Sequence, residues 1–561
     1  MSRQAEHRFE QMVAQSADYQ RSWRKQNSRH FEFYDGSQWS EADLAVLNDR
    51  GQHPTVINLC RAQVDMLAAI QIESASDIVL VGREAADDEL SHEYTSLLRQ
   101  VEETSKYKFH RNASFMDGLK GGIGWLHLGV KTNGVKDKKQ IWVRRRPWEE
   151  FFWDPYAVEA TLEDARFIAR TYWIDRDSAA KQWPGKKEEI EQMHETALGP
   201  HQDDFNSQET NVQSVLATRP LITMTTNGRR IRVTEMWYRE ADDEIHRVVY
   251  SGPVFLEGSE DGENPSPFDD KDIYPFVPFT AFKDRHGNPM GIIAFIISLQ
   301  ELLNKVNSKY LHALSSYTAM FEEGAIDDMD ELYHQLAKPD TMIRVNDGAM
   351  KDGRITVSKQ STEMVHLKEM ITMYISLIQR VTGVNDTLLG FSTTNARSAL
   401  QESSRAAQGT AMQTTIMESF NLTNQKAAEI VVKLIGQFYD DDVKARIVGS
   451  DGNVEFASFD NEIPTGVIDE VTGELVATGE TVKQHISDIL RYDVIFKRVS
   501  TFTSMREHQL KMIVEVIKAQ ILPPEVAGPL VIENLDLDNK QEILARLNQA
   551  MQPAQEQQML A

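Results

Sequence analysis

The sequence is poor in cysteine, in long apolar runs and in positive charge. Its one cysteine, Cys60, excludes an intrachain disulfide and any cysteine-rich zinc or iron–sulfur site, and fits a reducing cytoplasm. The most apolar run, residues 290–299, is half the roughly 20 residues that span a bilayer. The N-terminus is charged and has no apolar signal segment. We therefore expect a soluble chain that has no membrane contact.

The charge balance is acidic. Lys and Arg total 60 against 85 Asp and Glu, which gives a net charge of −25. Proteins that hold nucleic acid firmly use a surplus of cations to displace counterions from phosphates. If this protein meets DNA, we expect it not to grip the duplex.

Catalytic motifs are also missing. No GxxxxGK[ST], HExxH, GxSxG or CxxC occurs, and the only Gly-Lys pair, Gly185-Lys186, lacks the upstream glycine of a phosphate loop. The acidic runs 327–330 and 440–442 lack EF-hand spacing, which favours solvated surface over a metal site. Arg144-Arg145-Arg146 could touch phosphate, but alternate strand side chains face opposite ways, which favours an interface or surface role. We expect no catalytic residue, metal or cofactor.

The residues that are present predict a mixed α+β chain. With 561 residues, 41% of them hydrophobic, the chain can form several domains or one large elongated architecture. Alternating apolar patterns predict strands at 78–82, 126–130, 141–145, 230–239, 245–254, 341–345, 354–357, 446–459 (a hairpin) and 492–497. The cluster Gly118, Gly121, Gly122 and Gly124 does not fit GxGxxG, so we interpret these residues as turn glycines.

Helical spacing dominates elsewhere. Residues 1–25 predict a helix, and an aromatic turn is expected at 31–39 with Gly36 at its bend. Residues 55–70 and 87–108 predict two further helices. From residue 289, apolar side chains follow one helical stripe to about 318, and a second seam-bearing helix begins near Thr362. A third, very long helix is predicted over 396–439. Long helices that bury one stripe each need neighbours, which a ring of copies can supply.

Several segments, taken in order, resemble the portal proteins of short-tailed bacteriophages. They are FYDGSQW (33–39), PTVIN (54–58), PWEEFFWDP (147–155), DARF (164–167), VTEMWY (233–238), YPFVP (274–278), HGNPMG (286–291) ahead of Gln300, Asn304 and Ser308, and RSAL (397–400). Each is weak alone, but their order is specific, and they cover about residues 30–540. The resemblance implies a portal fold with a β-containing wing, a helical stem and crown and a small α/β clip, assembled as a ring that usually has twelve subunits.

Carried onto this chain, the resemblance implies domain boundaries. The wing takes residues 1–288 and 396–503, the first stem helix 289–318, the clip 319–361, the second stem helix 362–384, the tunnel loop 385–395, and the crown and C-terminal tail 504–561. It also implies a DNA channel lined by the tunnel loop and stem, for which the candidates are Asn385, Asp386, Thr387, Leu388, Leu389, Phe391, Lys305 and Lys309. The two lysines could equally bond neighbouring subunits.

The resemblance further implies partners. The acidic clip residues Glu322, Glu323, Asp327, Asp328 and Asp330 are the candidates for docking the terminase and later the tail adaptors. Major capsid and scaffolding proteins and passing double-stranded DNA complete the expected partners, at a capsid vertex assembled in the host cytoplasm. Two alternatives remain open: a nuclease or ATPase subunit of the packaging machinery, which the missing phosphate loop disfavours, and an elongated scaffolding protein, which the β-rich first half disfavours.

Overall fold

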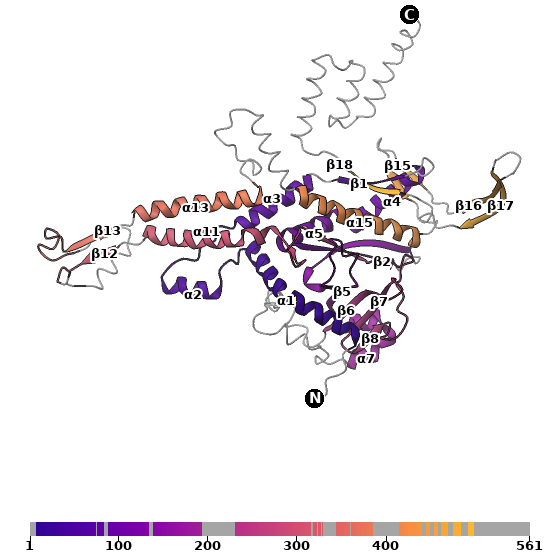
Figure 1. Cartoon of the computed structure of the whole chain (residues 1–561), viewed down its shortest axis with the longest axis horizontal. Helices are drawn as coiled ribbons and strands as arrows, with labels where there is room; N and C mark the ends of the chain where they lie inside the picture. The colour runs from indigo at the N-terminus through magenta and orange to yellow at the C-terminus, as the bar shows by residue number, and fades with distance from the viewer. Residues whose placement is uncertain are drawn as a thin grey trace, which may run out of the picture.

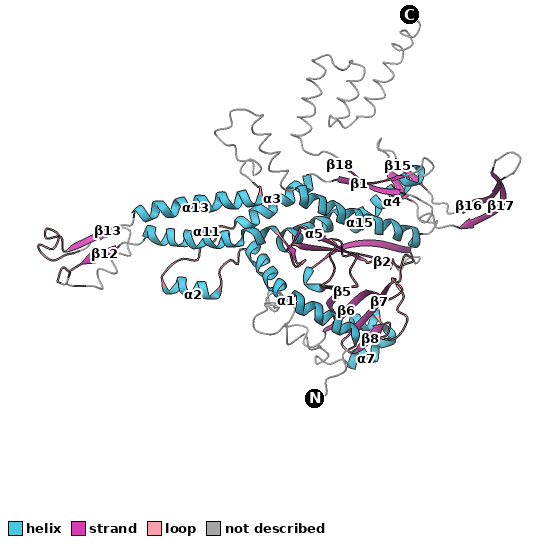
Figure 2. Ribbon diagram, viewed as in Figure 1, coloured by secondary structure: helices cyan, strands magenta, loops and turns pink. Residues whose placement is uncertain are grey.

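The computed structural model shows an elongated α+β chain (Figure 1). Two long helices lie side by side and project from a body that contains both helices and strands. The residues that the structure describes are 7–73, 76–82, 88–133, 138–192, 230–315, 318–322, 324–326, 328, 344–358, 361–384, 414–439, 445–448, 454–457, 462–468, 475–483 and 492–498. Helix and strand are interleaved along this part of the chain (Figure 2). The mixed α+β expectation is therefore confirmed.

Helix α1 (Arg8–Asp35) is longer than the sequence predicted. The His7 ring accepts a hydrogen bond from the Glu10 backbone N–H and caps its start, and Gly36, at φ 98°, ends it. The chain bends at Gly36 as predicted, but the aromatic residues before it were wrongly placed in the turn, because Phe33 and Tyr34 form the last helical turn and bury their rings in the body. Their burial outweighs the modest helix propensity of aromatic residues.

A three-stranded antiparallel sheet lies under helix α5 (Tyr107–Gly121). Its order is β3-β2-β9, and its strands are β2 (Ile123–Asn133), β3 (Lys138–Arg146) and β9 (Phe276–Thr280). The predicted strands at 126–130 and 141–145 are confirmed, and they pair with each other in antiparallel register. The turn interpretation of the glycines was wrong except at Gly122, which caps α5 at φ 95°. A Cβ on Gly118 would lie 2.3 Å from the Phe279 ring, so this helical glycine permits close packing of α5 on β9.

A five-stranded antiparallel sheet forms the other end of the body, in the order β4-β5-β6-β7-β8. Its strands are β4 (Phe151–Trp153), β5 (Phe167–Asp175), β6 (Arg230–Arg239), β7 (Ile245–Ser251) and β8 (Val254–Glu257). Phe9 and Val13 of α1 pack on one face against Met236 and Tyr238. The short helices α6 (Arg176–Gln182) and α7 (Lys187–Gln192) contribute apolar side chains to a second cluster with β6, β7 and β8, and η3 (Pro184–Lys186) connects them.

The projecting pair consists of α11 (Ile292–Ser315) and α13 (Ser361–Thr382). Both predicted helices are confirmed, a few residues shorter than expected. The short strands β12 (Thr318–Phe321) and β13 (Ile355–Ser358) join them as an antiparallel ladder at the far end. The predicted strand at 341–345 is not a strand at Arg344 and Val345, and its other residues lie outside the described part. The partner of β13 is β12, which the sequence did not predict.

The remaining elements lie around the sheets and the projecting helices. They are α2 (Glu41–Asp49), α3 (Leu59–Glu73), β1 (Ser76–Gly82), α4 (Asp88–Ser105), η2 (Trp148–Glu150), β10 (Phe282–Lys283), β11 (Pro289–Met290), α15 (Thr414–Phe438), β14 (Ala445–Val448), β15 (Val454–Ala457), β16 (Glu462–Ile468), β17 (Leu475–Lys483) and β18 (Tyr492–Arg498). The β14–β15 hairpin was predicted, whereas the pairing of β1 with β18 was not. Of the predicted helix at 396–439, the described part shows α15; residues 504–561 lie outside it.

Candidate functional site

The projecting helices α11 and α13, called the stem here, bury one seam against each other and the body. Ile296 and Leu303 of α11 and Ile378 of α13 are fully buried, in a core that also holds Phe115 of α5 and Phe420 of α15. The stem is therefore rooted in the body at its base. Its 24-residue helix α11 rises about 36 Å at 1.5 Å per residue, so its outer turns extend past this core.

The outward faces of the stem carry large apolar side chains. Phe295 and Leu302 of α11 are more than 40% exposed, and Val365 of α13 reaches 56%. The same helices expose Leu311, Leu314, Met370, Met373 and Val381. Single exposed apolar residues are ordinary, but eight on one helix pair leave a large amount of apolar side chain in contact with water. The stem thus has apolar surface that the described part of the chain does not cover.

A buried polar ladder on α11 fixes the segment 53–59 alongside the stem. The Gln300 amide donates to the Ile57 carbonyl at 2.6 Å and accepts from the Leu59 N–H at 3.2 Å. Asn304, 1% exposed, accepts from the Ile57 N–H at 3.1 Å and donates to Gln38 Oε1 at 2.6 Å. The backbone groups of Ile57 and the N–H of Leu59 thus find their hydrogen-bond partners in side chains of α11.

The ladder continues outward by one more turn. The Ser308 hydroxyl donates to the His53 carbonyl at 2.6 Å, and the Asn307 amide donates to Thr55 Oγ1 at 2.9 Å. The sequence singled out Gln300, Asn304 and Ser308 through the family resemblance alone. Their spacing of four puts three polar residues on one face of an otherwise apolar helix, which was the available signal for their docking role.

The lone thiol lies beside this ladder. Cys60 is fully buried, with Sγ 3.9 Å from Gln300 Oε1. Burial raises the pKa of the Cys60 thiol to about 12. A thiol at that pKa holds almost no thiolate at neutral pH and is chemically inert while the ladder is closed.

The two stem lysines both have carboxylate partners within the chain. Lys305 Nζ lies 3.5 Å from Asp43 of α2, and Lys309 Nζ lies 2.7 Å from Glu363 of α13. Both side chains are half-exposed, so each ion pair contributes about 0–1 kcal/mol and leaves the ammonium group accessible to solvent. Lys305 therefore bonds the α2 segment, and Lys309 joins the two stem helices.

The acidic surplus of the chain does not reside on the stem. Helices α11 and α13 together carry four Lys and Arg against three Glu. The net charge of the whole chain therefore gives no measure of the charge on the stem. Acidic surface is found instead between β8 and β9, where residues 257–272 contain seven carboxylates and one lysine.

The clip candidates are placed only in part. Glu322 is exposed and lies 3.4 Å from Arg354 next to the β12–β13 ladder, and Asp328 is exposed. Met320 and Met350 are also exposed, at 61% and 77%, so this tip of the chain is apolar as well as acidic. Glu323, Asp327 and Asp330 lie outside the described residues, as do Asn385, Asp386, Thr387, Leu388, Leu389 and Phe391 of the tunnel-loop prediction.

The arginine run divides as strand geometry requires. Arg145 binds Asp117 of α5 at 2.5 Å on one face of β3. Arg144 and Arg146 share the other face, both beside the Trp142 ring, and Arg146 donates to His127 Nδ1 at 3.4 Å. Burial first, and then Arg170, lower the pKa of Arg146 to about 10. Arg145 therefore lies in one packing environment, and Arg144 and Arg146 lie in another on the opposite face of β3.

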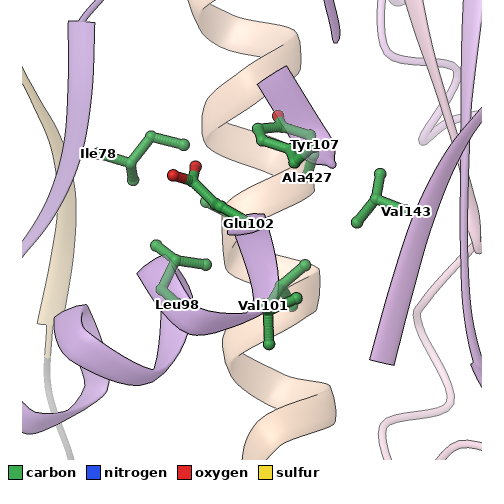
Figure 3. A pocket seen from close by; sticks show the side chains of 9 residues that line it. Ile78, Leu98, Val101, Glu102, Tyr107, Val143 and Ala427 are labelled. Carbon is green, nitrogen blue, oxygen red and sulfur yellow. The ribbon is translucent and has the colours of Figure 1, made fainter. Parts of the chain in front are cut away.

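No enzyme-like site emerges from the described residues. Among them no three His, Cys, Asp or Glu side chains are grouped to hold a metal ion, and the helices found there all fall short of the length and apolarity that a bilayer crossing requires. One small apolar pocket between β1, α4 and α15 leaves room for little more than a water-sized molecule (Figure 3). It is lined by Ile78, Leu98, Val101, Glu102, Tyr107, Val143, Ala427, Ala428 and Val431.

Comparison with known proteins gives these features a family. The model of the phage P22-like portal protein family matches residues 10–561. The chain belongs to this family. A curated portal protein of Helicobacter pylori bacteriophage KHP30 is 24% identical over 426 residues, which cover 74% of this chain and 64% of the relative. This P22-like portal chain therefore spans less than two thirds of that relative's length.

Membership confirms the resemblance read from the sequence motifs. The match of the portal family model includes the stem, the body sheets and the ladder segment 53–59 together. The features described above are thus those of a phage portal family member.

Proposed function

We propose that this chain is the subunit of a portal ring at one capsid vertex, through which double-stranded DNA is packaged and later leaves. Family membership supports the assignment. The structural observation that carries it is the apolar outer surface of the stem, because a helix pair with uncovered apolar side chains needs neighbours and copies of itself can supply them on closing a ring.

The domain plan follows the family resemblance. Residues 1–288 and 396–503 form the wing, 289–318 and 362–384 the stem, 319–361 the clip, 385–395 the tunnel loop and 504–561 the crown. Terminase, and later tail adaptors, dock on the clip, where the exposed Glu322, Asp328, Met320 and Met350 supply both charge and apolar contact. The ring stands in the virion, with twelve subunits as the expected number, and contacts the capsid and scaffolding proteins during assembly in the host cytoplasm.

The DNA role follows from charge. The chain has a net charge of −25 and its two stem helices together are nearly neutral, so neither supplies the surplus of cations that would hold the duplex. Lys305 and Lys309 keep accessible ammonium groups beside their carboxylate partners, which suits brief phosphate contacts. The proposal includes no catalytic reaction, metal or cofactor, and purified protein should show neither ATP hydrolysis nor nuclease activity.

Negative-stain imaging and mass photometry of the purified chain test the ring. Annular particles are expected. Val365→Glu, on the exposed face of α13, should reduce them strongly, because it places a charge in the apolar contact. Val158→Glu is the matched control: it makes the same change at a residue that is 79% exposed on the body, and rings should persist.

A compact monomer at high concentration would contradict the proposal. So would equal ring loss in both variants, because the stem surface would then have no special part in assembly.

A further inference from the structure

Strand β3 forms a basic edge in an acidic chain. Its sheet, in the order β3-β2-β9, carries five Lys and Arg in β3 and one Lys in β2, and none of the three strands contains Asp or Glu. The chain as a whole has a net charge of −25. The proposed ring gives no reason for this local concentration of positive charge.

Arg144 and Arg146, the two outer members of the arginine run, converge on one face of β3. Their guanidinium carbons lie 5.2 and 5.8 Å from the centre of the same ring, that of Trp142. Four residues of strand span about 13 Å, so the Arg146 side chain turns back towards Arg144 to reach this ring. Gly129 lies opposite Trp142 on β2, and a Cβ there would lie 2.5 Å from the indole. The two guanidinium groups therefore share one closely packed aromatic neighbour.

Neither guanidinium group has a carboxylate within ion-pair distance in the part of the chain that the structure describes. Arg144 is exposed, and Arg146 is half-buried and donates a hydrogen bond only to Nδ1 of His127, at 3.4 Å. Burial lowers the pKa of Arg146 to about 10. A cation that gives up hydration without gaining an anion is destabilising, so Arg146 in particular lacks a partner.

The carboxylates of the neighbouring five-stranded sheet and of η2 are already engaged. Arg170 of β5 pairs with Glu150 at 2.7 Å, and Arg247 of β7 pairs with Glu235 at 3.1 Å and also with Glu257. Two of these carboxylates also attract the half-buried guanidinium group of β3 from beyond ion-pair distance, but its burial has the larger effect.

Two histidines register the positive field around the pair. Burial, and then four arginines, hold the pKa of His127 well below its usual value. Burial, and then four cations, lower the pKa of His110 at the start of α5. The charges with the largest effect on the two rings are all positive, and they belong to Arg144, Arg145, Arg146, Arg170, Arg247 and Lys106. An anion that approaches this face of β3 meets a positive potential.

The two unpaired groups suit a phosphate better than a carboxylate. A carboxylate carries one negative charge, and a single guanidinium fork matches its two oxygens. A phosphate monoester has three acceptor oxygens and about −1.5 to −2 charges at pH 7, close to the charge of two cations that lack partners. Two arginines can therefore donate to different oxygens of one phosphate.

We propose that Arg144 and Arg146 form a phosphate-binding site on the face of β3 that carries Trp142. The ligand is a phosphate group, either a free one or one of the backbone phosphates of a nucleic acid. The inference goes beyond the proposed ring and does not depend on it, because both arginines belong to one copy of the chain.

Calorimetric titration of the full chain with inorganic phosphate at neutral pH tests the site. Chloride keeps the ionic strength constant, so that general attraction between charges stays equally screened. Phosphate should bind the parent, and Arg144→Gln and Arg146→Gln should each weaken binding about tenfold or more, because each removes a charge-assisted hydrogen bond. Arg144 is exposed, so Arg144→Gln keeps the test decisive if Arg146→Gln disturbs the sheet.

Arg285→Gln is the matched control. Arg285 is exposed in the turn between β10 and β11 and, like Arg144, has no carboxylate partner among the described residues. The variant removes the same charge from the chain at a place without a second guanidinium group. Its affinity for phosphate should equal that of the parent.

Competition distinguishes the two sources of phosphate. A short DNA duplex without terminal phosphates that displaces inorganic phosphate from the parent assigns the site to a nucleic-acid backbone. A nucleoside monophosphate that displaces it where the duplex does not assigns the site to free phosphate groups. Both results support a phosphate ligand.

Three results would overturn the proposal. They are the absence of phosphate binding to the parent, phosphate binding that survives Arg144→Gln and Arg146→Gln together, and acetate binding as tight as phosphate binding. The last result would make the site one for carboxylates. None of the three bears on the proposed ring, which is tested by the annular particles.

Discussion

Asn304 is the residue on which the docking of the 53–59 segment depends most. Asn304→Leu keeps the number and branching of the side-chain heavy atoms in a site that is 1% exposed, and any overpacking by its larger methyl groups adds to the loss of hydrogen bonds. The change removes the only hydrogen-bond partner of the Ile57 N–H and of Gln38 Oε1 among the described contacts. Each buried group left unpaired costs about 1–3 kcal/mol, which gives about 2–6 kcal/mol in total.

The assay uses the buried thiol next to the ladder. Cys60 reacts with a thiol reagent only when the segment opens, because it is fully buried and its pKa is raised to about 12. If opening and closing are fast, the labelling rate follows the opening equilibrium, so a loss of 2 kcal/mol raises the rate about 30-fold. Hydrogen exchange across residues 52–59 should accelerate by the same factor.

Asn307→Leu is the matched control. It makes the same substitution one turn away, where a half-buried amide holds one hydrogen bond to Thr55 Oγ1 and water can replace it. The expected loss is about 0.5–1.5 kcal/mol, or roughly a two- to tenfold faster labelling. Equal labelling rates in the two variants, or an Asn304→Leu protein that labels as slowly as the parent, would refute the ladder reasoning.

Three further predictions concern the body. Burial and then Arg29 lower the pKa of His30 to about 4, so the unfolded chain takes up a proton at His30 before the folded chain does. The contribution of His30 to stability should be full above pH 6.5 and fall by about 3 kcal/mol towards pH 4. In pH-dependent denaturation, His30→Phe should remove that share of the slope, while His110 and His127, whose pKa values burial also lowers, keep theirs; His366→Gln, at an exposed site, is the control. Gly118→Ala should cost about 1–3 kcal/mol in denaturant unfolding, because its methyl group meets the Phe279 ring, whereas Gly185→Ala, which meets nothing within 4 Å, should change stability by less than about 0.5 kcal/mol. Ala427→Val should partly fill the pocket of Figure 3 and raise stability by about 0.5–1 kcal/mol; a lower melting temperature would show that the pocket walls cannot accept the two carbons.

Local patterns in the sequence determined a large part of the fold. The apolar stripes from residue 289 and from residue 362 predicted α11 and α13 to within a few residues, since a helix that buries one face repeats its apolar positions every 3.6 residues. Strands β2, β3, β6 and the β14–β15 hairpin were found in the same way from alternation and turn residues. The order of the short motifs along the chain led to the portal family, which the family model confirms.

The functional surfaces were less accessible from sequence. The family resemblance predicted Lys305 and Lys309, the cations of the first stem helix, as channel residues, with contacts between subunits as the alternative. The sequence around these lysines does not predict their ion-pair partners. Asp43 pairs with Lys305 and Glu363 with Lys309, and both carboxylates are distant from the lysines in sequence. The apolar residues on the outer stem faces could not be told from buried ones for a related reason: a periodic pattern identifies a helix, but exposure depends on what the rest of the chain covers.

The sequence by itself determined the α+β class, the stem helices and the family, because periodicity and motif order are local properties that can be read along the chain. Only the tertiary structure decided that β1 pairs with β18, with Ser76 opposite Arg498, that Gly118 is a helical contact with Phe279, and that Asn304 holds Ile57 and Gln38. Each of these depends on segments distant in sequence approaching within a few ångströms. That approach is set by how the whole chain packs its side chains, and no window of neighbouring residues contains it.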